Sequence, residues 1–149
     1  MGIQTSAGTT LSISATLPTT FDDGVAGYPT LTFSAAGEIT EVPSFGSTYA
    51  LVTHSPVAER EITKRKGSVN HGTLSLTFAA DAADTGQTAF KTASIADTEV
   101  AIEVTYPDGE IDYFTALVMN FNIVAGGADS IKQGAVTLEL TRAPFNVAA

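Results

Sequence analysis

Strict alternation of apolar and polar residues is the feature of this sequence that most constrains its fold. A period of two residues is typical of strands with one face buried. The β-favouring residues Val, Ile, Thr, Phe and Tyr together supply more than a third of the chain, which supports the same interpretation. The alternation predicts strands over residues 11–17, 73–78, 100–106, 111–123 and 136–141.

One of these strands carries apolar residues on both of its faces. In the segment 111–123 the second face, which begins polar at Asp112, becomes apolar in its middle. Such a strand is either bent or covered on both sides. The preceding segment 107–109 is Pro-Asp-Gly, which predicts a tight turn because Pro presets the first corner and Gly tolerates positive φ.

The segment 81–95 departs from the alternation. Phe90 and Ala93 follow a helical spacing, and Asp84 with Gln87 three residues later resembles a capping box. The sequence therefore predicts an all-β domain with one short helix packed on a sheet.

The charge composition excludes one class of function and raises a question about the surface. Seven Lys and Arg against sixteen Asp and Glu give a net charge of −9, which is unsuited to gripping nucleic acid through its phosphates. Charged residues make up only 15% of the chain, against about 25% in ordinary soluble domains. Either this is a peculiarity of composition, or copies of the same chain cover much of the surface.

Several kinds of chemistry lack the residues they need. The chain has no Cys, so disulfides and thiolate sites are excluded. His54 and His71 have no convergent carboxylates around them, and no serine lies in a nucleophile-elbow motif. We expect no enzyme activity, no metal and no cofactor. No signal peptide or membrane span is visible, and a loose myristoylation pattern at Gly2 and Ser6 has no second membrane signal to support it.

A connection of unusual length runs from residue 46 to residue 67. Connections longer than about 12–15 residues are usually functional or disordered. This one carries four of the seven basic residues, which are Arg60, Lys64, Arg65 and Lys66. It is either a mobile, solvated loop or an arm that docks on an acidic surface of another copy.

As an arm, residues 46–66 are expected to form a hairpin when docked, with legs at 49–52 and 61–63 and with His54 near the tip. Ordering the backbone costs roughly 1–2 kcal/mol per residue, whereas exposed salt bridges return only about 0–1 kcal/mol each. Burial of apolar side chains must therefore supply most of the docking energy, and the basic residues set register and speed. The apolar candidates are Tyr49, Leu51, Val52 and Ile62.

Six blocks of the sequence, in order along nearly the whole chain, resemble one protein family. They are GIQTSAGTTLSI (2–13), GEITEVPSFG (37–46), YALVTH (49–54), KRKGS (64–68), DTGQT (84–88) and YFTALVM (113–119). The chain is similar in these blocks to the major tail tube proteins of long, non-contractile-tailed bacteriophages. Each block is weakly specific by itself, and their ordered series carries the resemblance.

The resemblance implies a β-sandwich or barrel-like tail-tube fold with a long β-hairpin arm, as a single domain over residues 1–149. It implies a structural subunit of stacked hexameric rings that form a hollow conduit for DNA, in a phage or a gene transfer agent. The implied partners are other copies, tape measure, tail terminator and tail tip proteins, with double-stranded DNA passing through without specific binding and no membrane. The protein would be made in the bacterial host cytoplasm and reside in the virion tail.

An acidic β-sandwich adhesin or carbohydrate-binding module is the alternative interpretation. Carbohydrate sites usually present exposed aromatic platforms, whereas this chain has no Trp and its tyrosines lie mostly in strand patterns. Regular hollow tubes in the electron microscope would separate the two interpretations.

The acidic charge suits the wall of a DNA conduit. An acidic wall repels the duplex over a Debye length of about 8 Å, whereas a basic wall would hold it. The candidates to line the lumen are carboxylates on the polar faces of strands, although alternation cannot distinguish the lumen from the outside. They are Glu38, Glu41, Glu103 and Glu139, with Asp112 behind them.

The two ends of the chain are candidates for contacts with a neighbouring subunit. In the C-terminal extension 143–149, Pro144 hinders continuation of a strand. We expect a free monomer to leave Phe145 and Val147 exposed, so that they, with residues 1–8, reach onto another copy.

Overall fold

The computed structural model describes residues 3–149, so Gly2 of the myristoylation pattern lies outside the described residues. Its strands are β1 (Thr10–Ser14), β2 (Ser34–Ala36), β3 (Ile39–Glu41), β4 (Thr48–His54), β5 (Thr63–Asn70), β6 (Thr73–Ala79), β7 (Val100–Thr105), β8 (Ile111–Val124), β9 (Gln133–Leu140) and β10 (Phe145–Val147). The 3-10 helix η1 covers Tyr28–Thr30 and the helix α1 covers Thr85–Ile95. Within residues 3–149, no helix is long and apolar enough to cross a membrane.

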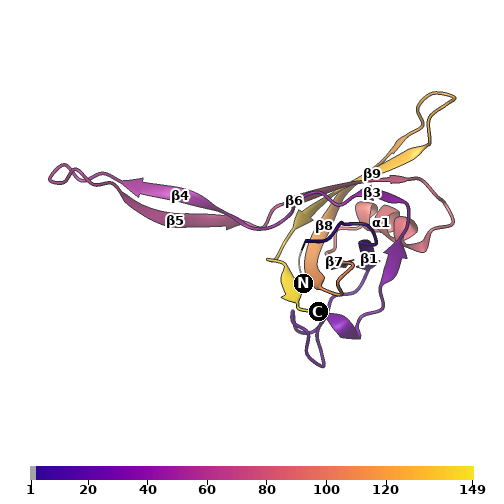
Figure 1. The fold of residues 1–149 in the computed structure, drawn as a ribbon, viewed down its shortest axis with the longest axis horizontal. Coiled ribbons are helices and arrows are strands. Elements are labelled where there is room, and N and C mark those ends of the chain that lie inside the picture. Colours follow the sequence, from indigo (N-terminus) through magenta and orange to yellow (C-terminus); the bar gives the residue numbers. More distant parts are fainter. Residues whose placement is uncertain (1–2) are drawn as a thin grey trace.

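The body of the molecule is one curled antiparallel sheet (Figure 1). Its strand order is β2-β1-β7-β8-β9-β6-β3, and β10 pairs with β8 outside this path. The two strands at the ends of the order, β2 and β3, are consecutive in the chain and are joined by Gly37 and Glu38. The sheet therefore curls until its ends meet at this corner, and the prediction of an all-β fold with one short helix is confirmed.

The predicted strands are confirmed in position, with two wrong boundaries. The strand expected over 136–141 begins three residues earlier, at Gln133. The strand expected over 11–17 ends at Ser14, where the Ser14 hydroxyl accepts a hydrogen bond from the Thr16 backbone N–H at 3.3 Å. This local turn competes with strand pairing. In β6 the alternation of buried and exposed residues is clean, whereas β1 and β7 are largely buried on both faces.

Two apolar clusters lie on opposite faces of the sheet. The larger one fills the inside of the curl and includes Phe90 and Ala93 of α1. The smaller one surrounds Tyr28, Ala101 and Tyr113, and the rings of Tyr28 and Tyr113 stack at 5.0 Å between centroids. The long strand β8 contributes to both clusters and has an irregular register between Val118 and Asn120, which explains its two apolar faces.

The start of α1 fastens the corner between β2 and β3. Asp84 caps the helix, accepting a hydrogen bond from the Gln87 backbone N–H at 3.0 Å, and its other oxygen accepts one from the Gly37 N–H at 2.9 Å. The Gln87 side chain is buried and does not return to the cap as a capping box requires. It accepts from the Asp81 N–H and donates to the carbonyls of Gly37 and Ala79. The capping prediction is therefore right for Asp84 and wrong for the Gln87 side chain.

The hairpin of β4 and β5 forms a separate two-stranded sheet that projects from the body (Figure 1). Every residue of β4 is exposed, and in β5 only Gly67 is partly covered. The predicted second leg at 61–63 is wrong, since β5 begins at Thr63 and continues to Asn70. Lys64, Arg65 and Lys66 lie within β5. A ribbon with both faces in water accepts charged side chains at every position. From here, "the arm" means residues 48–70.

The C-terminal segment pairs with its own chain. Strand β10 lies antiparallel to the start of β8, with Phe145 opposite Tyr113 and Val147 opposite Ile111. Phe145 and Val147 are partly buried against the smaller cluster. The expectation that a single chain leaves them exposed is wrong, because the chain resumes its pairing after Pro144.

Candidate functional site

The arm carries apolar and basic side chains on both of its faces. Tyr49, Leu51 and Thr53 share one face, and their cross-strand partners there are Val69, Lys66 and Lys64 respectively. We call these six residues the arm face. Lys66 Nζ lies 4.5 Å from the centre of the Tyr49 ring, which confirms this arrangement.

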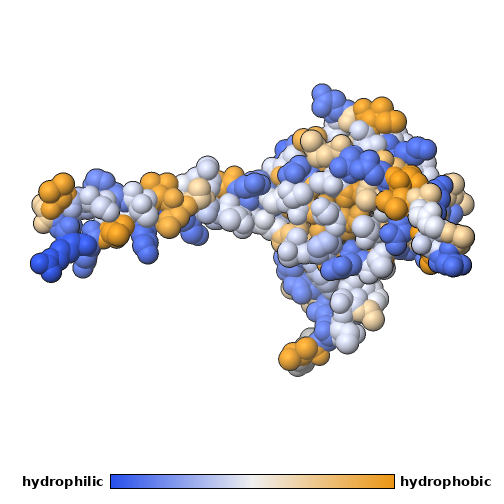
Figure 2. All heavy atoms as spheres, turned by 90° about the horizontal axis from the view of Figure 1, so that it is seen from above, coloured by the Kyte–Doolittle hydropathy of each residue, from blue (hydrophilic) through white to orange (hydrophobic). Residues whose placement is uncertain are grey.

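The opposite side of the arm has the same mixed character. Val52 lies opposite Arg65, and His54 lies opposite Thr63 next to the tip. Ile62 is 56% exposed in the turn at the end of the arm, where Arg60 is also exposed. Figure 2 shows hydrophobic and hydrophilic side chains next to one another along the whole arm.

The basic side chains of the arm have no carboxylate partners in the described chain. Among residues 3–149, the structure has one ion pair, between Arg142 and Glu99 at 3.0 Å, and it lies in the body. Lys66 rests on the Tyr49 ring, and Arg65 donates to the neighbouring Lys64 carbonyl at 3.0 Å. The positive charge of the arm is therefore available to a partner.

The root of the arm is held by local hydrogen bonds. The Ser47 hydroxyl and His71 Nδ1 are 3.0 Å apart, and the Gly72 N–H donates to the Asn70 side chain at 2.9 Å. Gly72 has a φ of 102°, and a Cβ there would collide with the Gly46 carbonyl oxygen. The direction in which the arm leaves the body is thus set by its own root.

The structure separates the five candidate lumen carboxylates. Glu103 pairs with Tyr113 and Glu139 pairs with Leu117, so Glu103 and Glu139 share one face of the sheet because the two partners are four residues apart on β8. Asp112 lies on the opposite face. Glu38 is wrongly placed by sequence reasoning, since it occupies the turn between β2 and β3 with a φ of 62° instead of a strand face.

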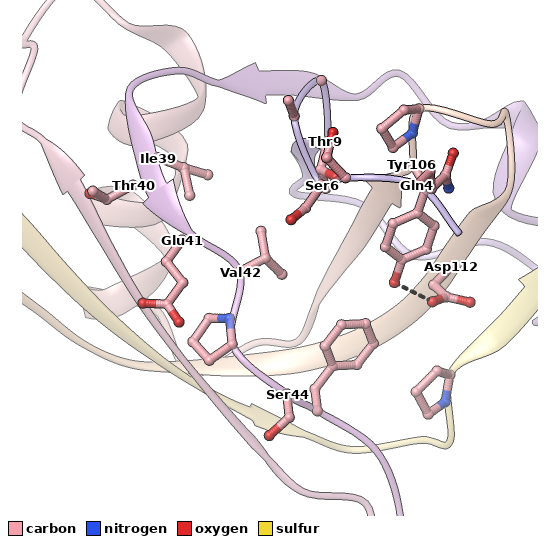
Figure 3. A pocket seen from close by; sticks show the side chains of 17 residues that line it. Gln4, Ser6, Thr9, Ile39, Thr40, Glu41, Val42, Ser44, Tyr106 and Asp112 are labelled. Atoms are coloured by element: carbon pink, nitrogen blue, oxygen red, sulfur yellow. Dashed lines mark hydrogen bonds between the residues drawn. The ribbon is translucent and has the colours of Figure 1, made fainter. Parts of the chain in front are cut away.

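Asp112 is engaged inside the chain. Its carboxylate accepts a hydrogen bond from the Tyr106 hydroxyl at 2.6 Å (Figure 3). It accepts a second one from the Asn146 side chain at 2.7 Å. Burial raises the pKa of Tyr106 well above its ordinary value of 10.0, and the hydrogen bond to Asp112 adds to the rise. This arrangement ties β10 to the turn between β7 and β8.

A groove of about 960 Å³ lies beside the root of the arm (Figure 3). Its walls come from residues 4–9, 39–45, 106–107, 112 and 144, and no Lys, Arg or His is among them. Glu41, at the exposed end of β3, and Asp112 are its carboxylates. Thr9 Oγ1 is buried there without a hydrogen-bond partner. Sequence reasoning missed this groove because its two main walls are distant in the chain.

A second projection was also missed. The hairpin between β8 and β9 extends from the body on the side away from the arm (Figure 1). Its strands and turn expose Met119, Ile123, Val124 and Ile131. The long alternation in β8 was the available signal, but it did not show that the end of the strand leaves the body.

The described part of the chain contains no group of three or more His, Asp or Glu side chains arranged to hold a metal ion.

The sequence as a whole matches one family model over residues 2–149, described as phage tail tube protein, TTP. The chain belongs to the phage tail tube protein family. A search of curated proteins finds no match.

Solved structures of tail tubes and injection systems share the fold. A chain in the anti-feeding prophage baseplate is 12% identical with a TM-score of 0.71, and the match covers 99% of this chain and 97% of that one. A chain in the structure of the sheath/tube terminator of an extracellular contractile injection system is 12% identical with a TM-score of 0.68, covering 99% of both chains. The SPP1 tail tube is 11% identical with a TM-score of 0.59, covering 95% of this chain and 77% of that one.

Family membership establishes a structural component of a phage tail tube. This coarse assignment agrees with the expectation of a self-assembling virion protein that is not an enzyme.

Proposed function

We propose that this tail tube protein forms hexameric rings that stack through the arm and enclose a channel for delivering DNA. The observation that carries the proposal is the arm, a hairpin exposed on both faces and bearing four basic residues without carboxylate partners in the described chain. An isolated two-stranded hairpin is at best marginally stable in water. A docking surface on another copy would supply the apolar contacts that the arm lacks.

Docking of the arm must overcome the cost of ordering it. That cost is roughly 1–2 kcal/mol per residue for the backbone, and exposed ion pairs return about 0–1 kcal/mol each. Apolar burial has to provide most of the energy, and Tyr49, Leu51 and Val52 are each at least half exposed. The charges of Lys64, Arg65 and Lys66 then set the register of docking and its speed.

The channel is proposed to have an acidic wall. Glu103 and Glu139 share one face of the sheet and are the pair that can face the same space, with Glu139 accepting a hydrogen bond from Thr73 at 2.9 Å. Replacing Glu139 by Lys is expected to leave tubes intact and to slow DNA ejection, because the new charge attracts phosphate. Unchanged ejection would argue against placing this face at the lumen.

The remaining partners in this proposal are those that the resemblance to the tail tube family implies. A head-to-tail contact whose rotation does not close continues into an open filament. The resemblance to tail tube proteins implies the tape measure, tail terminator and tail tip proteins as the further partners, and the assembled product resides in the virion. DNA passes through the channel without specific binding.

Electron microscopy of the concentrated protein tests the proposal. We expect negatively stained hollow tubes built from six-fold rings. A variant in which residues 48–70 are replaced by Asn-Gly, a favoured two-residue hairpin turn, joins Ser47 to His71 without disturbing the body. This variant should stay folded and never stack. Absence of tubes from the unmodified chain, or tubes from the armless variant, would contradict the proposal.

The carbohydrate-binding alternative finds little support in the positions of the tyrosines. Tyr28 and Tyr113 are buried, and the Tyr106 hydroxyl is held by Asp112. Tyr49 is half exposed, but Lys66 covers its ring. A sugar platform needs a free aromatic face.

A further inference from the structure

We infer that the groove beside the root of the arm is the receptor for the arm face of a second copy. The inference rests on the proposed function, in which the arm docks on another subunit, and it names the surface that receives it.

Charge is the first argument for this pairing. The arm face presents Lys64 and Lys66, neither of which is ion-paired in the described chain. The groove presents Glu41 and contains no basic residue. Glu41 likewise has no ion-pair partner among residues 3–149, so docking would give each side the opposite charge that it lacks.

The apolar parts of the two surfaces are the second argument. Beside its two lysines, the arm face exposes the side chains of Tyr49, Leu51 and Val69, whose exposed fractions are 50%, 68% and 42% respectively. The groove offers the partly buried side chains of Val42 and Phe45. A contact between them removes apolar area from water on both sides, which is the dominant favourable term in association.

Unpaired backbone is the third argument. Strand β3 forms one wall of the groove and stands at the end of the sheet, with β6 as its one partner in the described chain. Its other edge therefore offers backbone N–H and C=O groups. Each arm strand also pairs on one side alone, so strand addition can join the arm of one copy to β3 of another.

The direction of the arm argues against docking in the groove of its own chain. The arm leaves the body at residues 45–48, next to Phe45 of the groove wall. It projects away from the body (Figure 1). Its seven-residue strand β4 spans about 23 Å at roughly 3.3 Å per residue. A ribbon that begins at the groove margin and points away from the body is placed to reach the groove of another copy, and the repeated contact is head to tail.

Site-directed disulfides test the contact directly, because the chain has no Cys of its own. We would mix a Thr53→Cys variant with a Ser44→Cys variant, assemble them and oxidise. Thr53 lies on the arm face and Ser44 on the groove wall, both exposed. Matched controls are Thr63→Cys, exposed on the other side of the arm, and Ser130→Cys, in the turn between β8 and β9.

The expected result is a covalent dimer of Thr53→Cys with Ser44→Cys at least tenfold more abundant than any control pair. A crosslink of the arm to Ser130→Cys instead, or tubes without a Thr53–Ser44 crosslink, would overturn the inference and leave the proposed function standing. Failure of the unmodified chain to form tubes would overturn both.

A charge swap gives a second, independent measurement. Lys64→Glu should raise the critical concentration for assembly roughly threefold to tenfold, and so should Glu41→Lys. The double variant should recover most of the loss. Arg65→Glu, which changes the charge equally on the other side of the arm, should not be rescued by Glu41→Lys.

The swap also decides between two roles for Glu41. A residue of the channel wall would affect DNA ejection and leave assembly unchanged, whereas the receptor role changes assembly first. Single variants that assemble like the unmodified chain would overturn the inference.

Discussion

The body and the arm are both antiparallel β-structure, and they are stabilised in different ways. In β9 of the body, Leu138 is completely buried within the larger cluster. In β4 of the arm, Leu51 is paired across the ribbon in the same manner but is 68% exposed. The two leucines have the same chemistry and the same kind of strand, and differ in whether a second layer covers them.

This difference shows that strand pairing and strand stability are separate properties. Backbone hydrogen bonds add a modest net amount to stability, since water satisfies the same groups in the unfolded chain. Burial provides the larger part, and in the arm that part is left to a partner.

The largest expected effect comes from removing the same side chain in both regions. Leu138→Ala should lower the free energy of unfolding by about 2–5 kcal/mol, because it leaves a cavity in the body. Leu51→Ala should change it by less than about 0.5 kcal/mol in the monomer. Urea unfolding of both variants measures the contrast, and equal losses would show that the arm is part of the cooperative core.

The corner between β2 and β3 provides the next test. Gln87→Ala would leave the Asp81 N–H and the carbonyls of Gly37 and Ala79 without their partner, at an expected cost of about 2–4 kcal/mol. Gln133→Ala, at an exposed position of β9, is the matched control and should cost less than about 0.5 kcal/mol. Similar values for the two would argue against a structural role for the buried amide.

High pH should affect the body through its buried tyrosines. Burial, with the charge of Glu103, raises the pKa of Tyr113 to about 12 from an ordinary value of 10.0. Because the unfolded chain loses this proton first, the stabilisation is complete below pH 10 and is lost as the pH rises toward 12. The loss should be about 1–2 kcal/mol for this group. Tyr113→Phe should flatten the slope of unfolding free energy against pH in that window, and an unchanged slope would contradict this origin.

The smallest effect is expected within the arm. Lys66→Ala removes the cation from the Tyr49 ring, an interaction of about 0.5–1 kcal/mol at an exposed site. We expect faster hydrogen exchange at arm amides in the monomer, with unfolding of the body unchanged. Lys91→Ala on α1, also exposed, should alter neither. Arm amides of the unmodified monomer that are as protected as those of β9 would remove the distinction between the two regions.

The sequence predicted structural features well where interactions between residues close in the chain determine them. The alternation located β6, β7, β8 and β9, because side chains on successive strand residues point to opposite faces whatever the rest of the chain does. The cap at Asp84 was found for the same reason, since the donor and acceptor are three residues apart.

The arm was only half predictable. Its length and its four basic residues marked residues 46–66 as unusual, but the second leg was placed too early. A ribbon without a core leaves no apolar pattern from which to read its register, so the pairing of Leu51 with Lys66 emerged from the structure alone.

What the sequence determined by itself is the set of strands, the single helix, the excess of acidic charge and the presence of an unusual basic connection. The tertiary structure alone decided that β2 and β3 form the two ends of a curled sheet, that Phe145 packs against its own chain, and that residues 4–9 face 39–45 across a groove. The physical reason is the distance along the chain over which each interaction acts. Periodicity and capping act between residues a few positions apart, whereas a groove or a corner exists only after strands distant in the chain have paired and the sheet has curled.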